Sequence, residues 1–182
     1  MSLTSESAVD AEKFRTFALS VYECDAVPAA CLFLQNRYHV NVNHLLFAAF
    51  VGAVRRRRLS QADLAAIRAC AGSWHSEVVE PLRALRQRLK TGPAPAPTPA
   101  TDELRRKLQA VEIDAELVEL LELGRLAATL DGPRAPGDAT ECAAAAMAEV
   151  VQLYCGGDTD GEDDSALTAI ATAAARQERS VT

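Results

Sequence analysis

The sequence predicts an all-α protein, a bundle of about six or seven helices. Alanine occurs 35 times in 182 residues, while aromatic residues make up only 5%. Alanine is the residue that costs least in a helix and it packs poorly in a sheet. Apolar residues recur every three or four positions, and no segment shows convincing strand character. The composition also excludes a collagen, a disulfide scaffold and a wholly disordered chain.

Three helices are expected in the first part of the chain. The first covers residues 8–23, with Ser7 as its N-cap. The second covers residues 28–38 and begins with a proline, which is favoured at the first helical position. The third begins after Asn41 and contains the apolar run 45–54. Because this run is apolar on nearly all sides, it predicts the central buried helix, and it is too short for the ~20 residues of a membrane span.

The fourth expected segment, residues 60–90, contains a signal for an interruption. It opens with Ser60 and Asp63, which are spaced as in a capping box. Pro81 lies inside its apolar repeat, where it lacks a backbone donor and crowds the preceding turn. We therefore predict two helices or one sharply bent helix, with the bend between Gly72 and Pro81.

A proline-rich stretch divides the chain. Residues 91–100 contain four prolines alternating with small residues, which favours an extended linker. The sequence thus predicts a helical core domain over residues 1–90, a linker over 91–100, and a C-terminal helical region over 101–182. This last region is expected to pack on the core or on a partner chain.

Three further helices are expected after the linker. A long helix runs from Thr101, as its cap, to Leu130, and another covers residues 140–155. A weak alanine-rich helix starts after Ser165, behind an acidic loop over residues 158–164. This loop does not fit the ligand pattern of an EF-hand, so no calcium site is predicted.

A narrow apolar stripe on the long helix suggests that the chain associates with itself. Its members step by four, three, four and three residues, which is typical of a helix that packs along a partner helix. The favoured interpretation is a non-enzymatic helical interaction or scaffold protein, with a homodimer formed through this stripe. The stripe consists of Leu104, Leu108, Val111, Ala115 and Val118.

The charges are distributed unevenly. Residues 50–90 carry nine basic and three acidic side chains, whereas residues 101–182 carry seven and seventeen. The acidic part is therefore expected to neutralise the basic part, within one chain or between chains. The basic groups Arg55–Arg58 and Arg83–Lys90 raise the alternative of a weak nucleic-acid binder. The net charge of -6 and the absence of aromatic residues among the arginines argue against it.

A second alternative is a small-molecule- or metal-binding enzyme. It would use His44, His75 and Glu77 near Trp74, if the third and fourth helices pack together. None of the spacings is typical of a metal or cofactor site, so no metal and no cofactor are predicted, and buried or solvent-facing structural histidines are the competing interpretation. Any binding site is expected in a hollow beside the predicted bend, lined by Asn43, His44, Trp74, His75 and Arg83.

The remaining signals concern the compartment. The five cysteines include no C-x-x-C pair and lie in apolar stretches, as free thiols do. Residues 1–7 lack the basic and apolar regions of a secretory signal. A reduced, cytoplasmic protein is the expectation.

Several segments resemble an uncharacterised proteobacterial family, the domain-of-unknown-function family 2390. The similarity covers residues 14–90 and extends weakly into the helix after the linker. The resemblance implies a soluble bacterial helical protein with no assigned activity. It is carried by Phe17-Ala-Leu-Ser-Val-Tyr22, Ala30-Cys-Leu32, Gln35, Val42-Asn43, Leu45-Leu-Phe47 and Trp74-His-Ser-Glu-Val-Val-Glu-Pro-Leu-Arg-Ala-Leu-Arg-Gln-Arg-Leu-Lys90.

Overall fold

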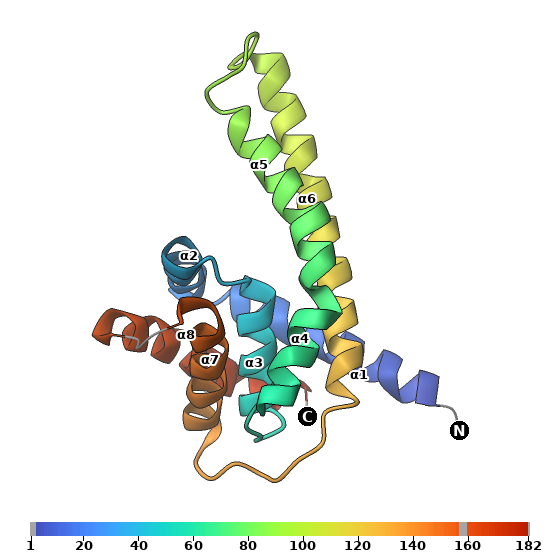
Figure 1. The fold of residues 1–182 in the computed structure, drawn as a ribbon, viewed down its shortest axis with the longest axis vertical. Coiled ribbons are helices and arrows are strands. Elements are labelled where there is room, and N and C mark those ends of the chain that lie inside the picture. Colours follow the sequence, from blue (N-terminus) through green and yellow to red (C-terminus); the bar gives the residue numbers. More distant parts are fainter. Residues whose placement is uncertain (1–2, 157–159, 182) are drawn as a thin grey trace.

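A computed structural model describes residues 3–156 and 160–181, and most of these residues lie in seven helical segments (Figure 1). No strand occurs in these residues, only one isolated β-bridge between Arg57 and Arg134. The predicted all-α class is confirmed. The segments are α1 (Leu3–Tyr22), α2 (Val27–Tyr38), α3 (Val42–Ala53), a continuous run of α4 (Gln61–Trp74), η1 (His75–Val79) and α5 (Glu80–Arg88), then α6 (Pro99–Ala127), α7 (Ala139–Cys155) and α8 (Gly161–Val181).

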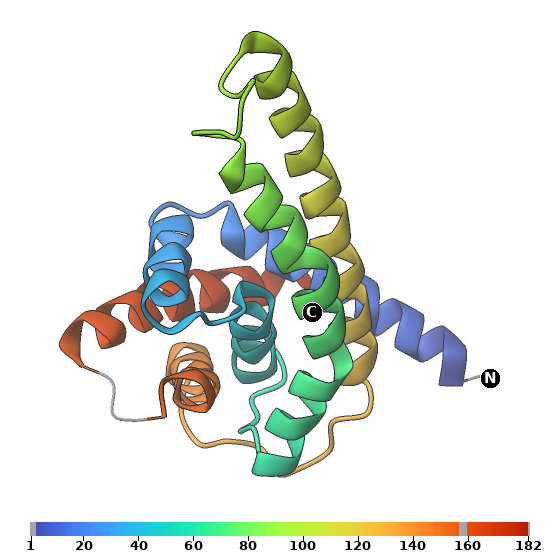
Figure 2. The same cartoon turned by 45° about the horizontal axis from the view of Figure 1, so that its top comes forward.

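Helix α3 lies at the centre, as its apolar sequence predicts. All of its residues from Asn43 to Ala53 are buried. Helices α1, α2, α6, α7 and α8 pack around it or around one another, so the helices before and after the proline-rich stretch share one core (Figure 2). Two phenylalanines of α1 pack on those of α3, with the rings of Phe14 and Phe47 5.2 Å apart and edge to face.

Two glycines allow helices to approach closely. A Cβ atom on Gly52 of α3 would lie 2.3 Å from the backbone oxygen of Cys142 in α7. A Cβ atom on Gly124 of α6 would lie 2.5 Å from Cα of Ala11 in α1. Both neighbours are backbone atoms, so only glycine fits at these helix crossings.

Helix α5 and the first part of α6 form an antiparallel hairpin that projects from the other helices (Figures 1 and 2). We call this hairpin, residues 80–118, the arm. The proline-rich stretch forms its tip. Helix α6 begins at Pro99, earlier than predicted, because Thr98 rather than Thr101 is the N-cap and forms a capping box with Thr101. The helix ends at Ala127, short of the predicted Leu130.

Between Gly72 and Pro81, where two helices or one sharp bend are predicted, the structure has neither, and only one turn of π-helix interrupts the α-helix. Helix α4 passes through one turn of π-helix, η1, directly into α5 (Figure 1). Pro81 lies in the first turn of α5, directly after the π-turn. It has no backbone N–H to donate to the preceding turn. The segment is thus one continuous helix with a π-turn, a feature that is frequent at functional sites.

The predicted caps hold at some helix ends and not at others. Ser60 and Asp63 form the expected capping box of α4, and Gly156 ends α7 in the left-handed conformation. Ser7 is not an N-cap, because α1 already begins at Leu3. Helix α8 begins at Gly161, so the acidic residues that follow are in its first turn, where they complement the helix dipole. Residues 158–159 of the predicted acidic loop lie outside the described residues.

None of the cysteines in the described residues forms a disulfide. Within the described ranges no single helix is long and apolar enough to cross a membrane, although residues 8–22 and α2 pass that test together as a pair bent by 97°.

Candidate functional site

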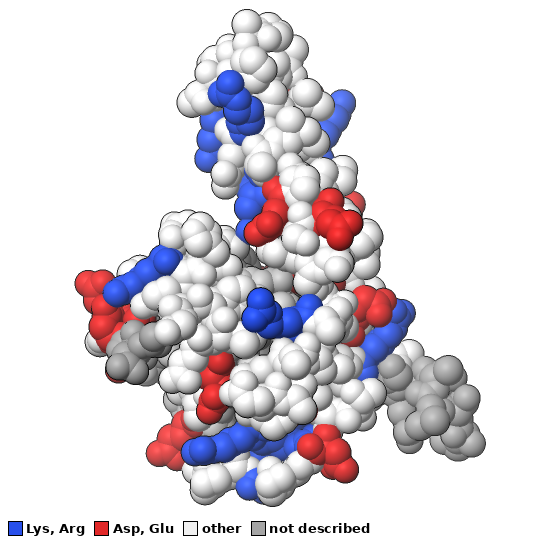
Figure 3. Space-filling view, in the orientation of Figure 1, with Lys and Arg blue, Asp and Glu red and all other residues white. Residues whose placement is uncertain are grey.

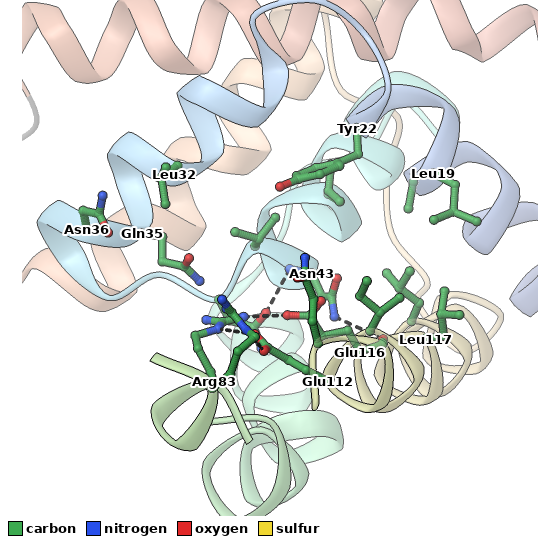
Figure 4. A pocket seen from close by; sticks show the side chains of 18 of the residues that line it. Leu19, Tyr22, Leu32, Gln35, Asn36, Asn43, Arg83, Glu112, Glu116 and Leu117 are labelled. Atoms are coloured by element: carbon green, nitrogen blue, oxygen red, sulfur yellow. Dashed lines mark hydrogen bonds and ion pairs between the residues drawn. The ribbon is translucent and has the colours of Figure 1, made fainter. Parts of the chain in front are cut away.

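A cleft of about 530 Å³ lies between α1, α2 and the base of the arm, with the start of α3 as its floor (Figure 4). Helices α1 and α2 supply an apolar wall that includes Leu19, Tyr22 and Leu32. Helix α6 adds Ile113 and Leu117 on the opposite side. A concave site of this size with apolar walls is the usual setting for a small ligand.

The wall of the cleft that α5 and α6 form carries charged side chains. Arg83 and Arg86, one helical turn apart on α5, face Glu112 and Glu116, one turn apart on α6 (Figure 4). Arg83 Nε donates to Glu112 Oε1 at 3.0 Å, and Arg83 Nη2 donates to Glu116 Oε1 at 2.5 Å. Arg86 donates to both oxygens of Glu112. These ion pairs hold α5 against α6.

The pKa values of the two glutamates shift in opposite directions. Burial alone would raise the pKa of Glu112, but hydrogen bonds from Arg86 and Arg83 outweigh it and lower this pKa below the usual value. Burial raises the pKa of Glu116, with Glu112 and Glu119 as further causes, and the single contact with Arg83 does not offset this. Glu116 is therefore the carboxyl group in the cleft that holds a proton most readily.

A third glutamate of the same helix face, Glu119, is completely buried below the cleft. Its carboxylate accepts hydrogen bonds from Asn41, from Asn43 Nδ2 at 3.0 Å and from His75 Nδ1, which lies 3.3 Å away. Burial would raise the pKa of Glu119, but the contacts with His75 and the two asparagines lower it. Asn41 also caps α3, so Glu119 fixes the start of the central helix to α6.

His44 is the most buried imidazole, with only 2% of its surface exposed. Its Nδ1 lies 2.8 Å from the Tyr154 hydroxyl, and its Nε2 lies 4.0 Å from Glu119 Oε1 without a hydrogen bond. Burial lowers the pKa of His44 to about 4. His44 is thus a neutral histidine of the core.

The five residues predicted to line one site lie in four different places. Asn43 and Arg83 line the cleft. His75 lies in a shallower hollow that also contains Arg83. His44 is enclosed in the core. Trp74, the last residue of α4, is 39% exposed, and its indole N–H donates to the Ala115 carbonyl oxygen at 2.9 Å.

The two imidazoles of the enzyme hypothesis do approach a common carboxylate, but it is not the predicted one. His75 and His44 both approach Glu119 of α6. Glu77 is exposed and takes no part in this contact. In residues 3–156 and 160–181 no group of three His, Cys, Asp or Glu side chains is placed to hold a metal ion.

Sequence reasoning missed three glutamates of α6, two in the charged wall of the cleft and one buried below it. Glu112, Glu116 and Glu119 are spaced by four and three residues, which is the spacing of one helix face. Arg83 and Arg86 are spaced by three, which also places them on one face. Two complementary charged faces on consecutive helices are a signal for an antiparallel hairpin, and this signal was present in the sequence.

Part of the other basic segment, Arg55–Arg58, also finds partners within the chain. Arg55 pairs with Asp10 at 3.0 Å, and Arg56 pairs with Glu178 at 3.2 Å. Arg57 donates to the Leu130 carbonyl oxygen. In Figure 3 basic and acidic side chains are interspersed over the visible face. The expected neutralisation of the basic part by the acidic part thus occurs within one chain for Arg56, Arg83 and Arg86.

Comparison with known proteins yields one family. The sequence profile of the family described as "Protein of unknown function (DUF2390)" matches residues 13–123, which is more than half of the chain. The match includes every residue that lines the cleft and the whole arm. No curated protein and no solved structure matches the chain. The chain belongs to this family of unknown function, as the segments around Trp74 and Pro81 suggest.

Proposed function

We propose that this chain is a non-enzymatic helical interaction protein that self-associates through the arm. The observation that carries the proposal is an exposed apolar stripe on α6. Leu104, Val111 and Val118 are each spaced by seven residues and expose 48%, 50% and 42% of their surface. A stripe of this spacing on a projecting helix is typical of a seam that packs on a second helix.

Only one side of the stripe is covered by other residues of the chain. Ala115 is buried, because the Trp74 indole packs beside it and donates to its carbonyl oxygen. The side of the stripe that faces α4 is therefore covered within the chain. The opposite side is exposed, and the half-exposed Trp74 adds an aromatic residue of the kind that is enriched in interfaces.

The charges beside the stripe favour an antiparallel pair of arms. Lys107 and Asp114 are also seven residues apart and flank Val111 on the same edge of α6. If Val111 lies on the two-fold axis, Leu104 meets Val118 of the partner subunit. The same register brings Lys107 next to Asp114 of the partner subunit, twice by symmetry.

The first test is a single charge at the centre of the stripe. Replacing Val111 by Asp is expected to convert a dimer into a monomer, because the carboxylate would be buried against its own symmetry mate. Light scattering at tens of micromolar protein measures this directly. The control is Val9→Asp, which makes the same change at an apolar residue of α1 that is 54% exposed, and it should leave the dimer intact. A monomeric unmodified chain would contradict the proposal.

The second test reverses the flanking charges. Lys107→Glu alone and Asp114→Lys alone are each expected to weaken dimerisation about tenfold, because two attractive pairs become repulsive. The double variant exchanges the charges and is expected to recover most of the loss. Sedimentation of the three variants at low salt provides the dissociation constants. Equal weakening in the double variant would exclude the antiparallel register.

A further inference from the structure

The cleft at the base of the arm brings together apolar side chains that the proposed self-association does not use. Its volume lies within the range of about 300–1,000 Å³ that is usual for small-molecule sites. The ring of Tyr22 projects into it from α1 (Figure 4). Four large apolar residues from three helices line the cleft, and each exposes between 39% and 53% of its surface: Leu19, Tyr22, Leu32 and Ile113. One apolar molecule in the cleft would cover all four from water.

The charged side chains that line the cleft balance one another. They are two arginines and two glutamates. Arg83 pairs with both Glu112 and Glu116, and Arg86 pairs with Glu112. An ion that enters the cleft therefore finds no free counter-charge, and it either stays unpaired or displaces one of these partners. Both outcomes cost free energy, so the cleft favours an uncharged ligand.

Side-chain amides supply most of the remaining polar groups of the cleft. Asn41 and Asn43 bind Glu119 below it. Gln35 points from α2 toward the charged wall (Figure 4). Four of the lining amides form no hydrogen bond within residues 3–156 and 160–181: Gln35, Asn36, Gln87 and Gln109. Each amide offers a donor and an acceptor, and a ligand that carries both kinds of group, such as another amide, matches them.

We propose that the cleft binds a small, uncharged amphipathic compound whose apolar groups are carried on amides. The apolar groups lie against Tyr22, Leu32 and Ile113, and the amides exchange hydrogen bonds with Gln35 and Gln109. No ion pair of the charged wall has to break for such a ligand to enter. The proposal depends on the lining of the cleft alone and does not depend on self-association through the arm.

Three probes that differ only in their end groups test the selection for an uncharged ligand. They are N-acetyl-leucyl-phenylalaninamide, which is neutral, N-acetyl-leucyl-phenylalanine, which is an anion, and leucyl-phenylalaninamide, a cation at about pH 6.5. Calorimetric titration of the full chain at this pH is expected to show at least about tenfold tighter binding of the neutral probe. Equally tight binding of either charged probe overturns the proposal. So does the absence of measurable binding of the neutral probe at millimolar concentration.

A matched pair of variants on α6 tests the place of binding. Ile113→Ser removes an apolar group from the cleft and is expected to weaken binding of the neutral probe about tenfold. Val111→Ser changes a similarly exposed residue two positions away, on the opposite side of the helix and outside the cleft, so the affinity should stay the same. Unchanged affinity in a folded Ile113→Ser variant refutes the assignment. Light scattering on both variants tests self-association separately, because only Val111 belongs to the α6 stripe.

A second pair of variants tests the role of the amides. Gln35→Met keeps the length of the side chain but removes its donor and acceptor, and it is expected to weaken binding of the neutral probe about fivefold. Gln61→Met makes the same change at an exposed residue of α4 outside the cleft and should leave the affinity unchanged. Equal affinities in the two variants would contradict hydrogen bonding between the ligand and Gln35.

Discussion

Gly52→Ala is expected to destabilise the protein by about 3 kcal/mol, although it adds only one methyl group. The new Cβ atom would lie 2.3 Å from the Cys142 oxygen and 2.5 Å from the Ala143 Cα atom. Both are backbone atoms of α7, so relief requires the two helices to separate along the most extensive contact of α3. Urea denaturation measures the loss as a lower midpoint at an unchanged slope.

The same substitution at Gly72 is the matched control. A Cβ atom there would meet nothing within 4 Å, and the residue lies inside α4. Because alanine is favoured over glycine in a helix, Gly72→Ala is expected to stabilise the protein by about 0.5–1 kcal/mol. Opposite signs at the two positions would support the packing of α3 on α7. A Gly52→Ala variant with unchanged stability would show that α3 and α7 lie farther apart at this crossing.

The second large effect is a loss of stability in mild acid that depends on His44. In the unfolded chain this histidine takes up a proton near pH 6.5, whereas burial lowers its pKa to about 4 in the folded protein. The unfolded state therefore binds more protons between these values, and the free energy of unfolding falls as the pH falls. This difference between the two pKa values corresponds to about 3 kcal/mol of the free energy of unfolding, which is lost progressively from pH 6.5 to 4.

A variant without this imidazole isolates its contribution. His44→Gln shares every other titrating group near the site, including Glu119, Tyr154 and His75. The stability of the unmodified chain relative to this variant should therefore decline from pH 6.5 to 4, as measured by urea denaturation at each pH. A constant difference over this range would mean that His44 titrates equally in both states, and that it is not a buried neutral group.

Local signals in the sequence were sufficient for most of the fold. The apolar run 45–54 identified the central helix, and Ser60 and Gly156 marked helix ends because a cap is a contact between near neighbours. The sequence alone did not show whether Thr98 or Thr101 is the N-cap of α6. Both are good capping residues, and at a spacing of three each can bond to the backbone of the other. Proline at the first position of α6 decided the start in favour of Thr98.

The site was less predictable, because a helical repeat shows which residues share a face but not which face points inward. Helix α6 has two such faces. The rule that apolar residues point inward favours the stripe of Leu104 and Val118, yet these residues are exposed, and Glu112 and Glu119 are buried. The glutamates face inward because arginines of α5 and the capped start of α3 offer partners for them. That pairing depends on the tertiary arrangement of three segments.

The central claim, an antiparallel pair of arms, is tested most directly by disulfide cross-linking between chains. Leu104→Cys and Val118→Cys are prepared separately and mixed under mild oxidation, with the unmodified chain and its five cysteines as background. The antiparallel register predicts a linked heterodimer in the mixture and little linked dimer in either variant alone. Efficient linkage of Leu104→Cys with itself would indicate parallel arms, and no linkage above background in the mixture would contradict association through this stripe.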